Sequence, residues 1–261
     1  MFLDDEMDII KVTSDVILHQ NILLYPGNSF CKKILRIFKN LDAFTQNNSH
    51  NSLPPDFYSN ELDCMFDVMR INDSEIRKSY NPVKIRERQA EKDIKNSGLE
   101  LKKDTVIFIN SESNDIREHT FKNYRKNCNR VLNEHIKKIP IWGKEHPNIK
   151  YKGLLIFDET ECYFDGYCKI AKNNRCFFIP EIQSSNLHKP WMDRDFIYNA
   201  YNSQLDFIVW VCPYKPYSLF QSQMYYEYPQ IAILDTRFKR TDYIQYNSPS
   251  TFPIFFYKND V

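Results

Sequence analysis

Two aspartates in one short apolar stretch are the residues of this chain best suited to chemistry. The stretch runs LPPDFYSNELDCMFDVMRI over residues 53–71, with Asp56 directly after two prolines and Asp67 inside CMFDVM. Two neighbouring carboxylates can hold Mg²⁺, which lowers the pKa of a bound water and neutralises charge building on a phosphate. The pattern therefore predicts a metal site for phosphodiester hydrolysis.

Neighbouring strands of one sheet would bring these two acids together. The residue types predict two strands, with Asp56 opening the first and Asp67 inside the second. Because alternate residues of a strand share a face, Asp63, Met65, Asp67 and Met69 are expected on one side. A carboxylate among apolar neighbours is costly to bury unless a cation accompanies it, and a metal ion would meet that need.

The stretch resembles the PD-(D/E)XK superfamily of restriction-endonuclease-like nucleases. The motif of that family is Pro-Asp, a gap of variable length, Asp or Glu, any residue, and Lys. Here Pro55-Asp56 is followed after ten residues by Asp67-Val68-Met69. The resemblance implies a central mixed sheet flanked by helices, Asp56 and Asp67 as ligands of Mg²⁺ or Mn²⁺, and a lysine that orients the attacking water.

The lysine position of the motif holds Met69, which has no charge. Alternation turns Arg70 to the other face of the strand. A substitute is therefore expected from the next segment, where Lys78 and Lys84 are candidates and Lys84 is taken as the third site residue. The structural alternative makes Asp56 a turn residue after the prolines and pairs Asp67 with a neighbouring arginine.

A second candidate site, ranked below the first, lies in the other half of the chain. There Asp165, Glu181 and Gln183 would take the three motif roles, although Pro180 would remove a backbone donor from the strand that carries Glu181. The order of predicted elements matches the nuclease core: helix 117–138, strands 151–161, 162–169 and 176–183, helix 193–202 and strand 205–211.

The remaining patterns complete a mixed α/β (α+β) fold, with a central mixed sheet flanked by helices, in a single domain over residues 1–261. The residues at 28–44 predict a helix capped by Asn28 or Ser29. Residues 45–55 and 212–229 are expected as loops. Further predictions are a solvent-facing helix over 83–96 and buried strands over 104–110 and 230–238.

Histidines and cysteines are expected to have structural roles. His119 and His135 lie too far apart along the helix over 117–138 to share a metal, so each is predicted to be a surface residue or a satisfied core residue. The seven cysteines are scattered, and several stand inside apolar runs. We expect them to be reduced and packed rather than bridged.

The net charge does not indicate a kind of partner, because the 35 basic residues are nearly balanced by 34 acidic ones. The segments at 122–130 and 238–246 interleave basic and aromatic residues, as a nucleic-acid groove would. The acidic start and the lack of a long apolar run predict a cytoplasmic protein without a membrane segment.

These patterns support a DNA-cutting enzyme, for example one of restriction or phage defence, with a homodimer as a candidate assembly. The alternative is a non-catalytic module of degenerate nuclease fold that binds nucleic acid or a protein. The tyrosine-rich piece at 214–228 would suit a protein partner.

Overall fold

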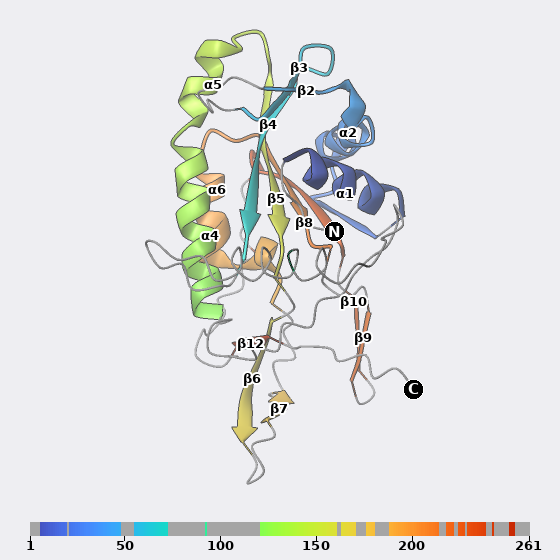
Figure 1. Cartoon of the computed structure of the whole chain (residues 1–261), viewed down its shortest axis with the longest axis vertical. Helices are drawn as coiled ribbons and strands as arrows, with labels where there is room; N and C mark the ends of the chain where they lie inside the picture. Colours follow the sequence, from blue (N-terminus) through green and yellow to red (C-terminus); the bar gives the residue numbers. More distant parts are fainter. Residues whose placement is uncertain are drawn as a thin grey trace.

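A seven-stranded mixed sheet forms the centre of the protein in a computed structural model of the chain (Figure 1). The three middle strands run parallel, and strands on either side of them run antiparallel. This confirms the predicted mixed α/β fold. The strand order is β1 (Ile22–Tyr25), β11 (Ile231–Asp235), β8 (Phe207–Val211), β5 (Tyr151–Asp158), β4 (Cys64–Ile71), β3 (Phe57–Ser59), β2 (Thr45–Gln46).

The predicted helix over 83–96 and strand over 104–110, with Lys78 and Lys84, lie outside the residues that the structure describes. Apart from the single positions 92 and 242, the described residues are 6–19, 21–47, 55–72, 121–160, 163–170, 176–180, 188–213, 218–221, 224–227, 229–238 and 251–253.

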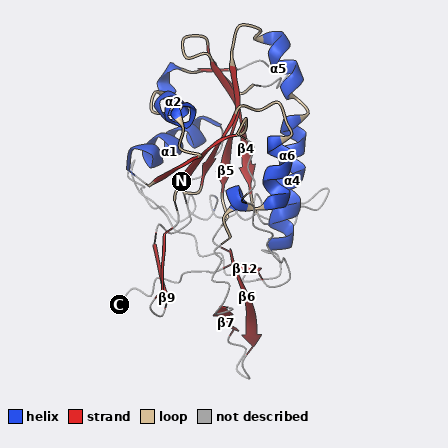
Figure 2. Ribbon diagram, turned by 180° about the vertical axis from the view of Figure 1, so that it is seen from behind, coloured by secondary structure: helices blue, strands red, loops and turns tan. Residues whose placement is uncertain are grey.

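Helices cover both faces of the central sheet, as Figure 1 and the view from behind in Figure 2 show. One face carries α1 (Glu6–His19) and α2 (Ser29–Phe38). The other carries α4 (Phe121–Ile136), α5 (Ile139–Glu145) and α6 (Arg194–Tyr201). Each face has its own apolar core, because strand residues alternate between the two sides.

The predicted helical segment at 28–44 forms α2 followed by a short 3-10 turn over Leu41–Ala43. Asn28 is the cap, and its side-chain oxygen accepts a hydrogen bond from the Cys31 amide at 2.9 Å. The cap was predicted because a helix start leaves backbone amides without partners. The helix ends sooner than expected, at Phe38.

Helix α4 buries one stripe of its side chains, including Phe121, Tyr124, Cys128 and Leu132. Strand β4 shows the period-two alternation that positions its aspartate. Phe66 and Val68 pack on the side of α1 and α2, whereas Met65 and Met69 pack on the side of α4. Asp67 therefore faces α4.

Two smaller sheets use the remaining described strands. One has the order β12 (Thr251–Pro253), β6 (Tyr163–Ile170), β7 (Cys176–Pro180), and the other pairs β10 (Met224–Glu227) with β9 (Ser218–Gln221). The pair β9–β10 lies inside the segment predicted as a loop. Of the helices in the described part of the chain, none has the length and apolar character to cross a membrane.

Candidate functional site

The pairing of β3 with β4 places Asp56 beside Asp67, as the sequence predicted. Phe57 is paired with Phe66 in the antiparallel ladder, so the next position along brings the two aspartates opposite each other. The Asp56 amide donates to Asp67 Oδ1 at 3.1 Å, and Asp56 Oδ2 accepts from the Val68 amide at 2.7 Å. Asp67 thus accepts from the backbone amide of Asp56, and Asp56 accepts from the amide of the residue after Asp67.

His135 of α4 is the partner of Asp67. Its Nδ1 contacts Asp67 Oδ2, so the two residues are hydrogen-bonded between the helix and the sheet. The Asp67 side chain is only 1% exposed, whereas that of His135 is 15% exposed. The alternative prediction of an arginine partner for Asp67 is therefore wrong: Arg70, on the other face, binds Glu159, with Nε 2.8 Å from the carboxylate.

The surroundings of Asp56 disfavour ionisation of its carboxyl. Burial and, after it, the adjacent Asp67 charge raise the pKa of its carboxyl to about 8, although the hydrogen bond from the Val68 amide lowers it. Two carboxylates that share a site cannot both ionise easily. Asp56 is thus mostly protonated at neutral pH in the metal-free protein.

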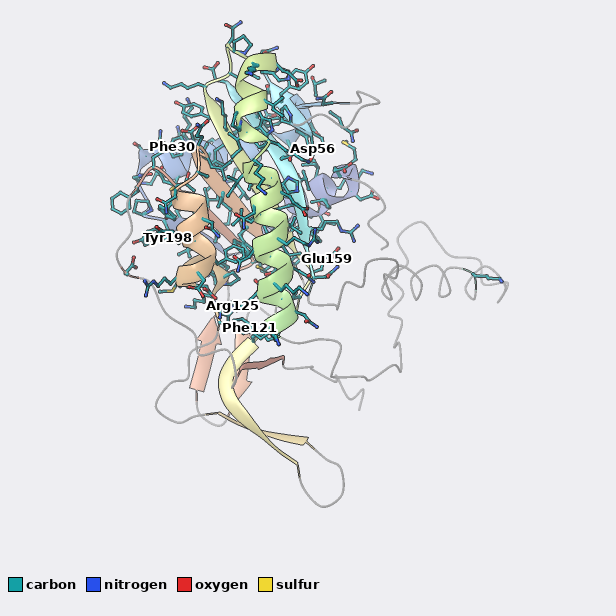
Figure 3. The ribbon with its side chains drawn as sticks, turned by 90° about the vertical axis from the view of Figure 1, so that its left-hand side faces the viewer. Phe30, Asp56, Phe121, Arg125, Glu159 and Tyr198 are labelled. Carbon is teal, nitrogen blue, oxygen red and sulfur yellow. The ribbon has the colours of Figure 1, made fainter. Side chains whose placement is uncertain are left out.

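Three more polar side chains belong to the same face of the sheet. Tyr58 stacks on His146 with ring centroids 4.5 Å apart. In the parallel pairing of β4 with β5, Lys152 stands opposite Met65 and Leu154 stands opposite Asp67. Lys152 is therefore the diagonal neighbour of Asp67, and both side chains lie on the same face of the sheet. Figure 3 shows Asp56 beside the upper part of the helical layer that covers this face.

Gly143 of α5 has no side chain and so leaves room for the Lys152 side chain. A Cβ atom added at Gly143 would stand 3.0 Å from Lys152 Nζ, so the glycine allows the ammonium group to lie close against the helix. No carboxylate among the described residues forms an ion pair with Lys152. Lys152 is a basic residue on this face that the sequence reasoning did not select.

Asp56 and Asp67 are the two carboxylates on this face that could hold a divalent cation. Mg²⁺ is commonly bound through one or two carboxylates, and water and substrate phosphates complete its shell. Asp56 and Asp67 could supply that pair, and a bound cation would favour the ionised form of the Asp56 carboxyl, whose pKa is raised without one. Within the described ranges, no three His, Cys, Asp or Glu side chains are grouped so as to hold a metal by themselves.

Asp158 provides a contrast within the same core. Its carboxylate is fully buried and accepts hydrogen bonds from Tyr124 Oη at 3.1 Å and Trp210 Nε1 at 3.2 Å. Thr160 adds its amide at 3.0 Å and its hydroxyl at 2.6 Å. A buried carboxylate with this many donors is a structural anchor, and Asp56 has no comparable set.

The second-ranked site is not assembled on the central sheet. Although β6 follows β5 in the chain, β6 pairs with β7 and β12, and Asp165 stands opposite Thr251. The predicted arrangement of these strands on one sheet with β5 and β8 is therefore wrong. The other two residues of that site, Glu181 and Gln183, lie beyond the described positions.

The basic and aromatic segment at 122–130 does not form the predicted interleaved surface. Tyr124 is 1% exposed, so its ring is not available to stack on a base. Arg125 and Arg130 are each paired with an acid, Asp195 and Glu134 respectively. Most of the second such segment, 238–246, lies outside the described residues.

The contribution of His135 could have been recognised from its spacing. It continues the buried stripe of α4, three residues after Leu132, and a polar residue in such a stripe needs a buried partner. Cys31, Cys64, Cys128 and Cys212 are buried and form no disulfide bridge, as predicted. Compared with known proteins, the chain matches no family model, no curated protein and no solved structure.

Proposed function

We propose that this protein is a metal-dependent phosphodiesterase that cleaves nucleic acid, with DNA as the first candidate substrate. The observation that carries the proposal is the side-by-side placement of Asp56 and Asp67, with the Asp56 amide 3.1 Å from the Asp67 carboxylate. The raised pKa of Asp56 supports it, because like charges held together without a cation are unfavourable.

In this proposal Asp56 and Asp67 hold Mg²⁺ or Mn²⁺. When bound, the ion would lower the pKa of a water molecule and offset the charge that develops on the scissile phosphate. His135 keeps Asp67 in place through the contact between Nδ1 and Oδ2. Such a contact fixes the direction of a ligand carboxylate, as second-layer partners do in metal sites.

We assign Lys152 to the role that Met69 cannot fill. Lys152 stands on the strand next to Asp67 and on the same face, and its ammonium group forms no ion pair with a carboxylate among the residues described. Its ammonium group would orient the attacking water and the phosphate by charge and hydrogen bonding. A relationship to restriction-endonuclease-like nucleases would fit this set, and Lys84 remains an alternative to Lys152.

A specific observation favours a second candidate, a non-catalytic binding module. The Asp67 side chain is 1% exposed, and Asp56 Oδ2 binds the Val68 amide at 2.7 Å, so both acids already have structural contacts. In that case Asp56 and Asp67 would only hold the start of β3 against β4 through these hydrogen bonds and would take no part in a reaction. Nucleic acid or a protein would then be bound elsewhere on the molecule.

Cleavage assays with the purified protein distinguish the two functions. We expect nicking of plasmid DNA in Mg²⁺ or Mn²⁺ buffer, with a loss of about 100-fold or more in Asp67→Asn and Lys152→Met, as for other groups that act on the transition state. Glu145→Gln, an exposed acid of α5, is the matched control and should cleave like the wild type.

The absence of cleavage with either metal, together with an unchanged melting temperature when metal is added, would favour the binding module. Asp56→Asn and Asp67→Asn should then bind DNA as the wild type does. A homodimer also stays a proposal, which light scattering of the same preparation tests.

A further inference from the structure

Two lysines converge on one tyrosine at the amino end of β5. Lys33 Nζ of α2 donates to Tyr151 Oη at 3.2 Å and lies 4.4 Å from the centroid of the same ring. Lys150 Nζ lies 5.3 Å from that centroid. Hydrogen bonds from Lys33 and, to a smaller extent, from Lys150 lower the pKa of the Tyr151 hydroxyl.

The ring beneath these lysines is fixed by packing. Tyr151 is 8% exposed and contacts Phe30, with ring centroids 5.4 Å apart. A third cation, Arg237, stacks over Phe30 at 3.4 Å from the centroid and binds Asp235. The hydroxyl of Tyr151 is therefore held at a fixed point, whereas both lysine residues are exposed.

Within the described residues, no carboxylate balances the charge of the two lysines at this point. Arg237 has Asp235 as its partner, but neither Lys33 nor Lys150 forms an ion pair with a carboxylate in the described part of the chain. Two ammonium groups that approach one hydroxyl repel each other, and an anion placed between them would remove the repulsion.

We propose that Lys33, Lys150 and Tyr151 bind a phosphate group. The two ammonium groups and the phenol hydroxyl provide several donors around one point, which suits a tetrahedral oxyanion, and lysine is a common phosphate ligand. The phosphate can belong to a nucleic-acid backbone or to a free phosphorylated molecule, since the chemistry that recognises it is the same.

This site does not rest on the Asp56–Asp67 proposal. Tyr151 packs with Phe30 and Phe66 in the core between α1, α2 and the sheet, whereas Asp67 faces α4 on the other side. Loss of one site should therefore leave the other unchanged.

Calorimetric titration with inorganic phosphate and fluorescence anisotropy with a labelled single-stranded oligonucleotide test the proposal at low salt. We expect the affinity for phosphate to fall about tenfold in Lys33→Gln and in Lys150→Gln, as for loss of a hydrogen bond to a charged group. Lys32→Gln is the matched control, because it removes the same charge from the preceding exposed position of α2 and should stay within about twofold. A parallel loss for the oligonucleotide identifies the source as a nucleic-acid backbone, and loss for phosphate alone identifies a free phosphorylated molecule.

Tyr151→Phe keeps the packed ring and removes only the hydroxyl, so this variant is expected to fold like the wild type. The difference in tyrosine absorbance between wild type and Tyr151→Phe reports the ionisation of this phenol. Phosphate should raise the pKa of Tyr151 toward its ordinary value, because the anion offsets the two lysines. Equal binding by wild type, Lys33→Gln and Lys150→Gln, or no binding of either probe by the wild type, would overturn the proposal.

Discussion

Asp67 Oδ2 and His135 Nδ1 are hydrogen-bonded although 68 residues separate them in the sequence. The contact joins the middle of β4 to the last turn of α4 and buries the carboxylate almost completely. Because a buried carboxylate needs partners, this pair helps to fix α4 over the sheet, together with the hydrogen bond from Tyr124 to Asp158.

Removal of His135 should destabilise the fold. In His135→Ala the Asp67 carboxylate loses a partner while it stays buried, and a buried group left without a partner costs about 1–3 kcal/mol. Urea unfolding measures the loss. Glu134→Gln, which changes the neighbouring exposed residue, should alter the free energy of unfolding by less than about 0.5 kcal/mol. Equal stability of the two variants would show that the pair contributes nothing.

The raised pKa of Asp56 predicts that stability falls as pH rises. Its pKa is about 8 in the folded protein and near 3.8 in the unfolded chain, so the folded state binds more protons between these values. Its contribution is fully present below the unfolded value and is lost as pH rises through the folded one, with a slope of at most about 1.4 kcal/mol per pH unit.

Asp56→Asn should flatten this dependence, because an amide does not titrate. Urea unfolding at several values between about pH 5 and about pH 8 compares the two slopes. Asp42→Asn, which alters an exposed acid in the 3-10 turn, controls for the loss of a charge. A wild-type slope that matches that of Asp56→Asn would mean that Asp56 titrates normally.

Binding of Mn²⁺ should release a proton. At neutral pH Asp56 holds its proton in the metal-free protein, and the ion has to displace it, so about one proton leaves per bound ion. Calorimetry in two buffers of different ionisation enthalpy counts the released protons, and the affinity should rise with pH. Asp56→Asn should show no release. A pH-independent affinity in the wild type would contradict the assignment of Asp56 as a ligand.

Two glycines should respond in opposite ways to alanine. A Cβ at Gly153 would stand 2.1 Å from Cε2 of the buried Phe207 ring, which cannot move away within a packed core. We expect Gly153→Ala to lower the free energy of unfolding by about 3 kcal/mol or more. At Gly143 the new Cβ meets only the end of the flexible Lys152 side chain, and alanine favours the helix, so the change should stay within about 1 kcal/mol.

Thermal unfolding of both variants measures the difference. The activity of Gly143→Ala adds a second readout, because the new methyl group would push the Lys152 ammonium group a few tenths of an ångström away from α5. If Lys152 takes part in cleavage, this variant should lose activity while it stays folded. A folded Gly153→Ala with an unchanged melting temperature would contradict the packing of Phe207 against the sheet.

Local sequence patterns were sufficient for the elements that carry the two acids. Strict alternation placed Asp67 on the same face as Met65 and Met69, and the prolines before Asp56 marked the start of the paired strand. Asn28 was identified as a cap from its residue type alone. These predictions hold because they depend on side-chain spacing within one element or between two adjacent ones.

What the sequence by itself determined is thus a mixed sheet with helices and the Asp56–Asp67 pair on it. Only the tertiary structure decided that His135 pairs with Asp67, that β6 leaves the sheet of β5, and that Lys33 meets Tyr151. The reason is physical: periodicity shows which face of an element is buried, but the partner on that face depends on how distant elements pack and in which register they lie.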